Sequence, residues 1–145
     1  MIAALSLSPV TRRPGLYFEA LSDRHFRAAN VAGFVRDLLR HLRGRVVLVW
    51  DNGAMHKGES IRQLLADYPR LSIESLPPYA PDLNPVEQLW NHLKYGGLAN
   101  FVPRDLDDLD DRAVDWLIDA KFDPDRLRSC YNNTPLKDAV GKFIN

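Results

Sequence analysis

Apolar positions near the start of the chain are spaced as in β-strands. Residues 2–8 and 15–22 are short apolar runs separated by a turn that contains prolines and arginines. In the second run Leu16, Phe18 and Ala20 share one face, because side chains two residues apart project to the same side of a strand. The two runs predict an antiparallel hairpin with a half-buried second strand.

The next 50 residues alternate between helical and strand-like patterns. Helices are predicted over residues 27–43 and 58–68, and strands over Val46–Trp50 and residues 71–76. The helical positions expected in the core are Val31, Phe34, Val35, Leu38, Leu39 and Leu42, followed by Ile61, Leu64, Leu65 and Tyr68. The run Val46–Trp50 has no polar alternation, which predicts a central strand covered on both faces. This order favours parallel strands joined by crossover helices, with the hairpin added to the same sheet.

Two more helices are predicted downstream, over residues 85–95 and 105–121. Their expected buried faces are Val86, Leu89, Trp90 and Leu93 in the first, and Leu106, Leu109, Ala113, Trp116, Leu117 and Ala120 in the second. The polar segment from Pro124 is expected to pack loosely. We therefore predict an α/β domain over residues 1–122 and a C-terminal tail over residues 123–145.

Length and composition restrict the class of protein only slightly. The chain has 145 residues, the size of one domain, and its 19 basic and 19 acidic residues cancel. This balance gives no strong overall field for nucleic acid or membrane. No apolar run approaches the 18 residues that a membrane span needs. The chain has one cysteine, Cys130, so an internal disulfide is ruled out, which fits a reducing compartment. Cys130 is expected to be a small buried apolar residue.

Asp51 is the first candidate for chemistry, because it directly follows the apolar strand Val46–Trp50. In open α/β sheets, ligands bind at the carboxyl ends of the strands. The alternative is an Asp-Asn-Gly hairpin turn, but the residues after Gly53 have a helical rather than a strand pattern. Asn52 and His56 could support a metal ion or contact phosphate, although a lone histidine at a helix start is more often structural.

Glu87 is the second candidate and lies in the first turn of the helix predicted from residue 85. Asn84 suits the N-cap and Pro85 the first helical position, so Glu87 also fits the capping-box spacing and needs no further role. Its side chain nevertheless lies off the apolar stripe. Asn91 and Lys94, four and seven residues later, share its exposed face and could contact a metal-bound phosphodiester.

The chemistry suggested by two carboxylates is metal-dependent. Mg²⁺ prefers oxygen ligands, and two such ions can activate a water or 3′-hydroxyl and stabilise the leaving oxygen. Two acids are few for two dications, so a third acid is expected. Two other charged groups are interpreted as solvated helix faces: Asp107, Asp108, Asp110 and Asp111, and the row Arg36, Arg40 and Arg43.

Two segments carry a family resemblance. Val-Leu-Val-Trp-Asp-Asn-Gly-Ala-Met-His-Lys at 47–57 and Leu-Pro-Pro-Tyr-Ala-Pro-Asp-Leu-Asn-Pro-Val-Glu-Gln-Leu-Trp-Asn-His-Leu-Lys at 76–94 resemble DDE transposases, of the mariner-like superfamily and its bacterial insertion-sequence relatives. The 35 residues between Asp51 and Glu87 suit that family's last two acids. The resemblance implies a ribonuclease-H-like mixed sheet with flanking helices. It also implies a site in which Asp51 and Glu87 bind two Mg²⁺ or Mn²⁺ ions, supported by Asn52, His56, Asn91 and Lys94.

The chain departs from this family upstream of Asp51. The only aspartates before Asp51 are Asp23 and Asp37, and neither lies on an opening apolar strand. The first strand of the fold, with the acid that it carries, is therefore expected to be lacking. The expected function is the C-terminal part of a transposase that cleaves and joins transposon ends and target DNA, inactive without an upstream polypeptide. The alternative is a non-enzymatic fragment that associates with full-length transposase. A homodimer is left open, no membrane partner is expected, and the expected location is the bacterial cytoplasm, on the nucleoid when DNA is bound.

Overall fold

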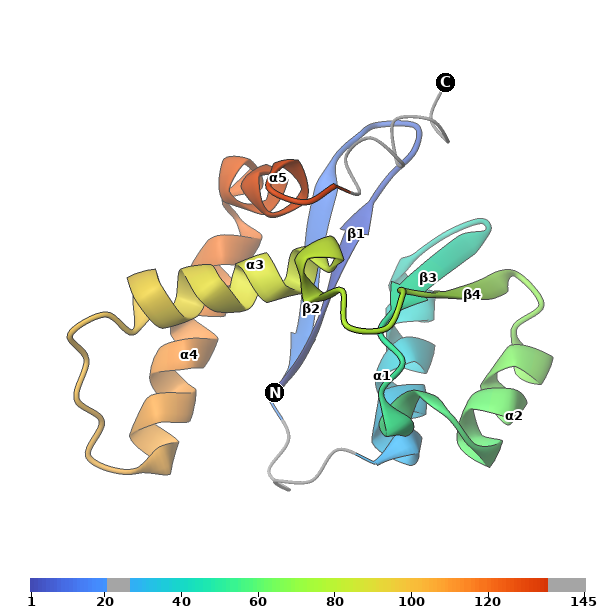
Figure 1. Ribbon diagram of the computed structural model, residues 1–145, viewed down its shortest axis with the longest axis horizontal. Helices are drawn as coiled ribbons and strands as arrows, with labels where there is room; N and C mark the ends of the chain where they lie inside the picture. The colour runs from blue at the N-terminus through green and yellow to red at the C-terminus, as the bar shows by residue number, and fades with distance from the viewer. Residues whose placement is uncertain (21–26, 136–145) are drawn as a thin grey trace. The chain divides into compact units, whose positions relative to one another are not determined.

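The computed structural model describes residues 1–20 and 27–135, which divide into two compact units (Figure 1). Of the described residues, one unit contains Ile2 and residues 27–81, and the other contains Met1, residues 3–20 and residues 82–135. Each unit is described by itself. Asp23 lies outside the described residues.

The unit that contains residues 27–81 has the predicted order of helix, strand, helix and strand. Its elements are α1 (Ala28–His41), β3 (Val46–Trp50), a 3₁₀ turn (Ala54–His56), α2 (Glu59–Asp67) and β4 (Leu71–Ser75). β3 and β4 pair in parallel, with Val46 opposite Leu71 and Trp50 opposite Ser75 (Figure 1). The predicted strand–helix–strand crossover is therefore confirmed, and it places the ends of both strands at one edge of the sheet.

The core of this unit comes from the apolar faces of α1 and α2. Its buried residues are Val31, Ala32, Phe34, Val35, Leu38, Leu39, Ile61, Leu64, Leu71 and Leu76. Arg70 donates hydrogen bonds to the carbonyl oxygens of Leu39 and, at 2.8 Å, of Gly44. Since the last carbonyls of a helix lack partners within it, Arg70 closes the end of α1.

The prediction that β3 is covered on both faces is wrong. Val47 and Val49 are 62% and 44% exposed, whereas Val46, Leu48 and Trp50 are half-buried. Side chains alternate between the faces of a strand, so one face of β3 is covered and the other lies open. Within the described residues β3 hydrogen-bonds to β4 alone, which leaves its other edge without a strand. A continuous apolar run does not by itself report how many faces a strand buries.

The expectation that the hairpin joins the same sheet is also wrong. β1 (Ile2–Leu7) and β2 (Pro14–Glu19) form a two-stranded sheet of their own, separate from the β3–β4 sheet among residues 1–20 and 27–135. The hairpin itself is confirmed. Its turn is held by the amide of Ser8 donating to the carbonyl of Arg13 at 3.2 Å.

The second unit packs helices against the hairpin (Figure 1). The helical elements are α3 (Pro85–His92), a π-helical turn (Leu93–Gly97), α4 (Leu106–Lys121) and α5 (Pro124–Asn132). The buried core consists of Leu16, Leu89, Leu117, Ala120, Leu127 and Cys130, with Phe18, Trp90 and Trp116 packed against it. β2 contacts α4 and α5, and Leu16 and Phe18 face the core as predicted, but Ala20 follows the strand and is exposed.

The expectation of a loosely packed tail is wrong for residues 124–132. Asp123 caps α5 by accepting a hydrogen bond from the Arg126 amide at 3.0 Å, and Pro124 occupies the first turn. α5 then buries Leu127 and Cys130 in the core. Two apolar positions in this helix suffice to anchor it, although the segment is polar overall.

Other differences from the expected faces are local. Leu65 and Leu106 are exposed instead of buried. Leu106 is the first residue of α4, about two turns before Ala113, the first buried residue of this helix. The four aspartates of α4 lie on its outer side as expected, and Asp108 pairs with Arg104 at 3.2 Å.

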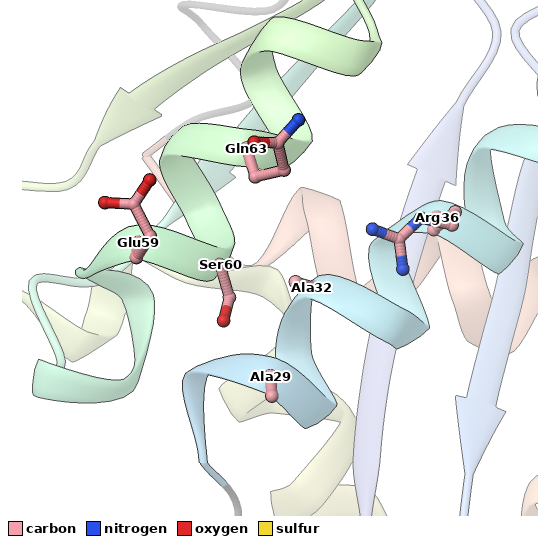
Figure 2. A pocket seen from close by; sticks show the side chains of 6 residues that line it. All are labelled: Ala29, Ala32, Arg36, Glu59, Ser60 and Gln63. Atoms are coloured by element: carbon pink, nitrogen blue, oxygen red, sulfur yellow. The ribbon is translucent and has the colours of Figure 1, made fainter.

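The three arginines of the helix predicted over residues 27–43 are only partly as expected, and Arg43 lies beyond the end of α1. Arg40 and Arg43 are exposed, and Arg40 pairs with Asp37 at 2.6 Å. Arg36 is half-buried and lines a hollow of about 360 Å³ between α1 and α2. Figure 2 shows it facing this hollow, whose other lining residues are Ala29, Ala32, Glu59, Ser60 and Gln63.

Cys130 makes the stability of this core sensitive to alkali. Burial raises the pKa of the Cys130 thiol to about 11, whereas an unfolded cysteine titrates near about 8.5. Above about pH 9 the unfolded chain loses this proton and the folded chain keeps it, so the free energy of unfolding falls as pH rises towards 11. The expected slope is at most about 1.4 kcal/mol per pH unit.

Urea unfolding at pH 8 and pH 10 measures this effect, with Cys130→Ala as the comparison. The variant should show a smaller fall between the two pH values. Burial also raises the pKa of Tyr131, but an unfolded tyrosine titrates near about 10, so its effect begins at higher pH. An equal fall in both proteins would contradict this role of Cys130.

Candidate active site

The ends of β3 and β4 are tied together immediately around Asp51. The Leu76 amide donates to the carbonyl of Trp50 at 2.8 Å, which extends the pairing one residue beyond β4. The side-chain amide of Asn52 donates back to the carbonyl of Leu76, also at 2.8 Å. Asn52, one of the predicted supporting residues, thus links the segments that follow β3 and β4 and fixes the position of Asp51.

The Asp51 carboxylate is held by one of its two oxygens. Its Oδ1 accepts a hydrogen bond from the Gly53 amide at 2.7 Å and lies 3.0 Å from the Nδ1 of His56. No hydrogen bond or ion pair engages Oδ2 among residues 1–20 and 27–135, and the side chain is 60% exposed. The carboxylate is therefore oriented while one oxygen remains open to solvent.

His56 contacts Asp51 through one ring nitrogen. Nδ1 also lies 2.9 Å from the backbone carbonyl oxygen of Asp51, so both of its neighbours are acceptors and Nδ1 carries the hydrogen. The ring stacks on Trp50, with centroids 4.4 Å apart and planes 7° from parallel. The 3₁₀ turn Ala54–His56 brings His56 back to the strand end, and the hairpin-turn alternative for Asp-Asn-Gly does not form.

Sequence reasoning did not identify Gly53 as necessary here. A Cβ atom on this residue would lie 2.9 Å from Asp51 Oδ1 and 3.6 Å from His56 Nδ1. The turn therefore requires a residue without a side chain if both contacts to Asp51 are to persist. The sequence Asp-Asn-Gly indicated a turn at this position, but it did not indicate that the glycine is needed for the hydrogen bond to the Asp51 carboxylate.

The loss of His56 should weaken the hold on Asp51. Since Asp51 is a predicted metal ligand, we expect His56→Ala to lower Mn²⁺ affinity by roughly 10- to 100-fold, the usual cost of removing a hydrogen bond that orients such a ligand. His56→Asn should retain part of the affinity, because its amide can donate from nearly the same place as Nδ1. Calorimetric titration with Mn²⁺ checks this, with His41→Ala on α1 as the control. Equal affinity in His56→Ala and the native chain would contradict it.

Glu87 lies where its sequence context predicts, in the first turn of α3. The Asn84 side chain caps the helix by accepting from the Val86 amide at 3.1 Å, and Pro85 begins it. The Glu87 side chain does not return to the Asn84 amide, so the capping-box alternative is not realised. Within the described part of the chain, the half-exposed carboxylate of Glu87 has no hydrogen-bond or ion-pair partner.

Asn91 and Lys94 follow Glu87 in the helical segment. Asn91 is exposed near the end of α3. Lys94 lies in the π-helical turn Leu93–Gly97, with its ammonium 5.2 Å from the centre of the Tyr95 ring. The predicted helix over 85–95 is thus present, but its last turn is wider than an α-helical one, as the Leu98 amide donates to the Leu93 carbonyl five residues back at 2.8 Å.

Asp51 belongs to one compact unit and Glu87 to the other, so their convergence on one ion stays a prediction. Across residues 1–20 and 27–135, no three His, Cys, Asp or Glu side chains are grouped closely enough to hold a metal ion. Each acid offers at least one unengaged carboxylate oxygen, the donor that a hard divalent cation prefers. Both residues fit such an ion as single ligands, with water or phosphate completing its coordination.

Comparisons with known proteins identify a family and a similar fold. A family profile described as DDE superfamily endonuclease matches residues 6–110. The chain belongs to this family. Its fold is similar to the crystal structure of the catalytic domain of Mos1 mariner transposase, with a TM-score of 0.55 and 21% identity over 83% of this chain and 70% of that one. No curated protein matches the sequence.

This similarity confirms the predicted ribonuclease-H-like α/β class, here with two small sheets and five α-helices among the described residues. It also confirms the resemblance to DDE transposases. In the described part of the chain, no helix is long and apolar enough to cross a membrane.

Proposed function

We propose that this chain is the catalytic portion of an insertion-sequence transposase that cleaves transposon ends and joins them to target DNA. The observation that supports this most is that Asp51, oriented by hydrogen bonds, and Glu87 both present unengaged carboxylate oxygens in a chain of the DDE endonuclease family. Asp51 follows β3 and Glu87 opens α3, and each has an oxygen free of protein partners in the described residues. Such a function places the protein in the bacterial cytoplasm, on nucleoid DNA.

The proposed roles follow from these positions. Asp51 and Glu87 bind Mg²⁺ or Mn²⁺, and two such ions would supply an activated hydroxyl and stabilise the leaving oxygen. Gly53 and His56 orient Asp51 so that its second oxygen faces solvent. Asn52 fixes the strand end, while Asn91 and Lys94 are proposed to contact the DNA backbone beside Glu87. Lys94 is suited to this because its ammonium makes only a cation–π contact within the described chain.

A third acid is proposed to come from a polypeptide upstream of this chain. Asp37 is a poor source because it lies within α1, and its carboxylate pairs with Arg40 at 2.6 Å. The open edge of β3 and the exposed Val47 and Val49 suit an added strand that carries this acid. On this proposal the 145-residue chain alone does not cleave DNA.

The test compares the chain alone with the same chain joined to the polypeptide encoded immediately upstream. Mn²⁺-dependent nicking of a plasmid that carries the element's ends is measured for both. We expect nicking by the joined protein and none by the chain alone. If a joined protein that carries an upstream strand with an aspartate is also inactive, the catalytic proposal fails.

The second candidate function is regulation of full-length transposase by this chain without catalysis. The free edge of β3 supports it, since an unpaired strand can pair with another polypeptide. Mixing the chain with full-length transposase separates the two functions. Reduced cleavage that requires the chain supports regulation, whereas unchanged cleavage argues against it.

A further inference from the structure

Tyr79 has an unusual backbone and no contact for its ring. It lies in the loop between β4 and α3 with φ at 58°, in the left-handed region that non-glycine residues rarely adopt. Its side chain is fully exposed, at 104% relative accessibility, and it has no hydrogen bond or ring contact among the described residues. Pro77, Pro78 and Pro81 flank it and restrict the loop.

No contact among the described residues offsets the unfavourable backbone conformation of Tyr79. A bulky aromatic residue in the left-handed region is disfavoured, and glycine or asparagine would adopt it more readily. Burial of the ring would offset the strain, but this ring buries nothing. Strained residues persist where the surrounding structure forces them, and they are concentrated at ligand-binding sites. The position of Tyr79 therefore directs attention to a partner outside the fold.

The loop that carries Tyr79 begins at the strand end that holds Asp51. Leu76, three residues before Tyr79, donates its amide to Trp50 and accepts a hydrogen bond from Asn52, both at 2.8 Å. Trp50 and Asn52 are the immediate neighbours of Asp51. All of these residues belong to the same compact unit, and the loop that carries Tyr79 begins at the sheet end where Asp51 follows β3.

We propose that Tyr79 stacks on an unpaired base of the DNA strand whose phosphate would be bound by the divalent cation proposed at Asp51. This inference rests on the proposed DNA-processing function. A flat aromatic ring without charge, held out by prolines, matches the face of a nucleobase, and such stacking is common where single strands are bound. Because the flanking prolines already restrict the backbone of the loop, ordering this loop on binding costs less conformational entropy. Stacking accepts any base, so Tyr79 contributes affinity and position rather than sequence preference.

The experiment uses the 145-residue chain and single-stranded oligonucleotides that carry 2-aminopurine at one position each. Its fluorescence reports both binding and stacking of the substituted base. Three variants are compared with the native chain. Tyr79→Phe keeps the ring, Tyr79→Asn removes it but tolerates the left-handed backbone, and Phe122→Asn removes an exposed aromatic residue at the end of α4 as the control.

We expect Tyr79→Phe and Phe122→Asn to bind like the native chain. Tyr79→Asn should bind roughly 5- to 150-fold more weakly, the loss of one base stack. It should also lose the fluorescence change at one oligonucleotide position, while its thermal midpoint equals or exceeds that of the native chain. This combination distinguishes a binding residue from one that supports the fold.

Three results would overturn the stacking role. They are native-like binding by Tyr79→Asn, an equal loss in Tyr79→Phe, or a lower thermal midpoint in Tyr79→Asn. In each case the native chain still binds DNA and the proposed function stands. If the native chain binds no oligonucleotide, the stacking role and DNA recognition by this chain fail together.

Discussion

Replacing Glu87 with glutamine is expected to lower Mn²⁺-dependent DNA cleavage by about two to four orders of magnitude in the joined protein. Glutamine preserves the size of the side chain and is accepted in the first turn of a helix, so α3 should remain intact. Only the negative charge that attracts the cation is lost. Asp51→Asn should have a similar effect, because asparagine can still accept the hydrogen bond from the Gly53 amide.

The matched control for this prediction is Glu59→Gln. Glu59 is also a glutamate in the first turn of a helix, α2, and pairs with Arg62 at 2.6 Å on the surface. A surface pair of this kind contributes little to stability, so cleavage by Glu59→Gln should be unchanged. If Glu87→Gln and Glu59→Gln cleave equally well, Glu87 has no part in the chemistry.

Gly97→Ala is expected to cause the largest loss of stability among the substitutions considered. A Cβ atom at Gly97 would fall 2.3 Å from Cδ1 and 2.6 Å from Cγ of Trp116. Gly97 ends the π-helical turn, and Trp116 packs from α4 against the core. Because both are held by packed helices, relief requires shifting one against the other. We expect the free energy of unfolding to fall by about 1–3 kcal/mol.

The neighbouring glycine provides an unusually close comparison. Gly96 lies in the same π-helical turn, and no atom lies within 4 Å of the Cβ that an alanine would add there. Gly96→Ala should be neutral or stabilise by up to about 1 kcal/mol through reduced freedom of the unfolded chain. Urea unfolding followed by tryptophan fluorescence measures both variants. Equal stability of the two would show that the contact between Gly97 and Trp116 is absent in solution.

Much of the candidate site could be predicted because its signals are local. A carboxylate that follows an apolar strand, as Asp51 follows Trp50, lies at a strand end whatever the rest of the chain does. The order Asn84, Pro85, Glu87 specifies a helix start within four residues, and the structure contains it. The family resemblance added the expectation that these two acids work together.

The features that were missed depend on contacts between segments. The stacking of His56 on Trp50 requires the 3₁₀ turn that follows Gly53, and single residues did not indicate that turn. The exposure of Val47 and Val49 depends on what covers β3, which an apolar run does not report. Likewise, α5 packs because Leu127 and Cys130 meet a core built by distant segments. The periodicity of apolar residues describes one helix or strand at a time, whereas ring stacking, strand exposure and helix packing depend on contacts between two elements.

The most direct test of a cation shared by Asp51 and Glu87 is paramagnetic broadening by Mn²⁺ in the isotopically labelled chain. Shared binding predicts that low Mn²⁺ broadens the amide signals of Gly53 and of residues 85–88 in parallel, and that Asp51→Asn removes both effects. Broadening at only one of the two segments, or broadening at residues 85–88 that persists in Asp51→Asn, would show that the two carboxylates do not bind a common ion.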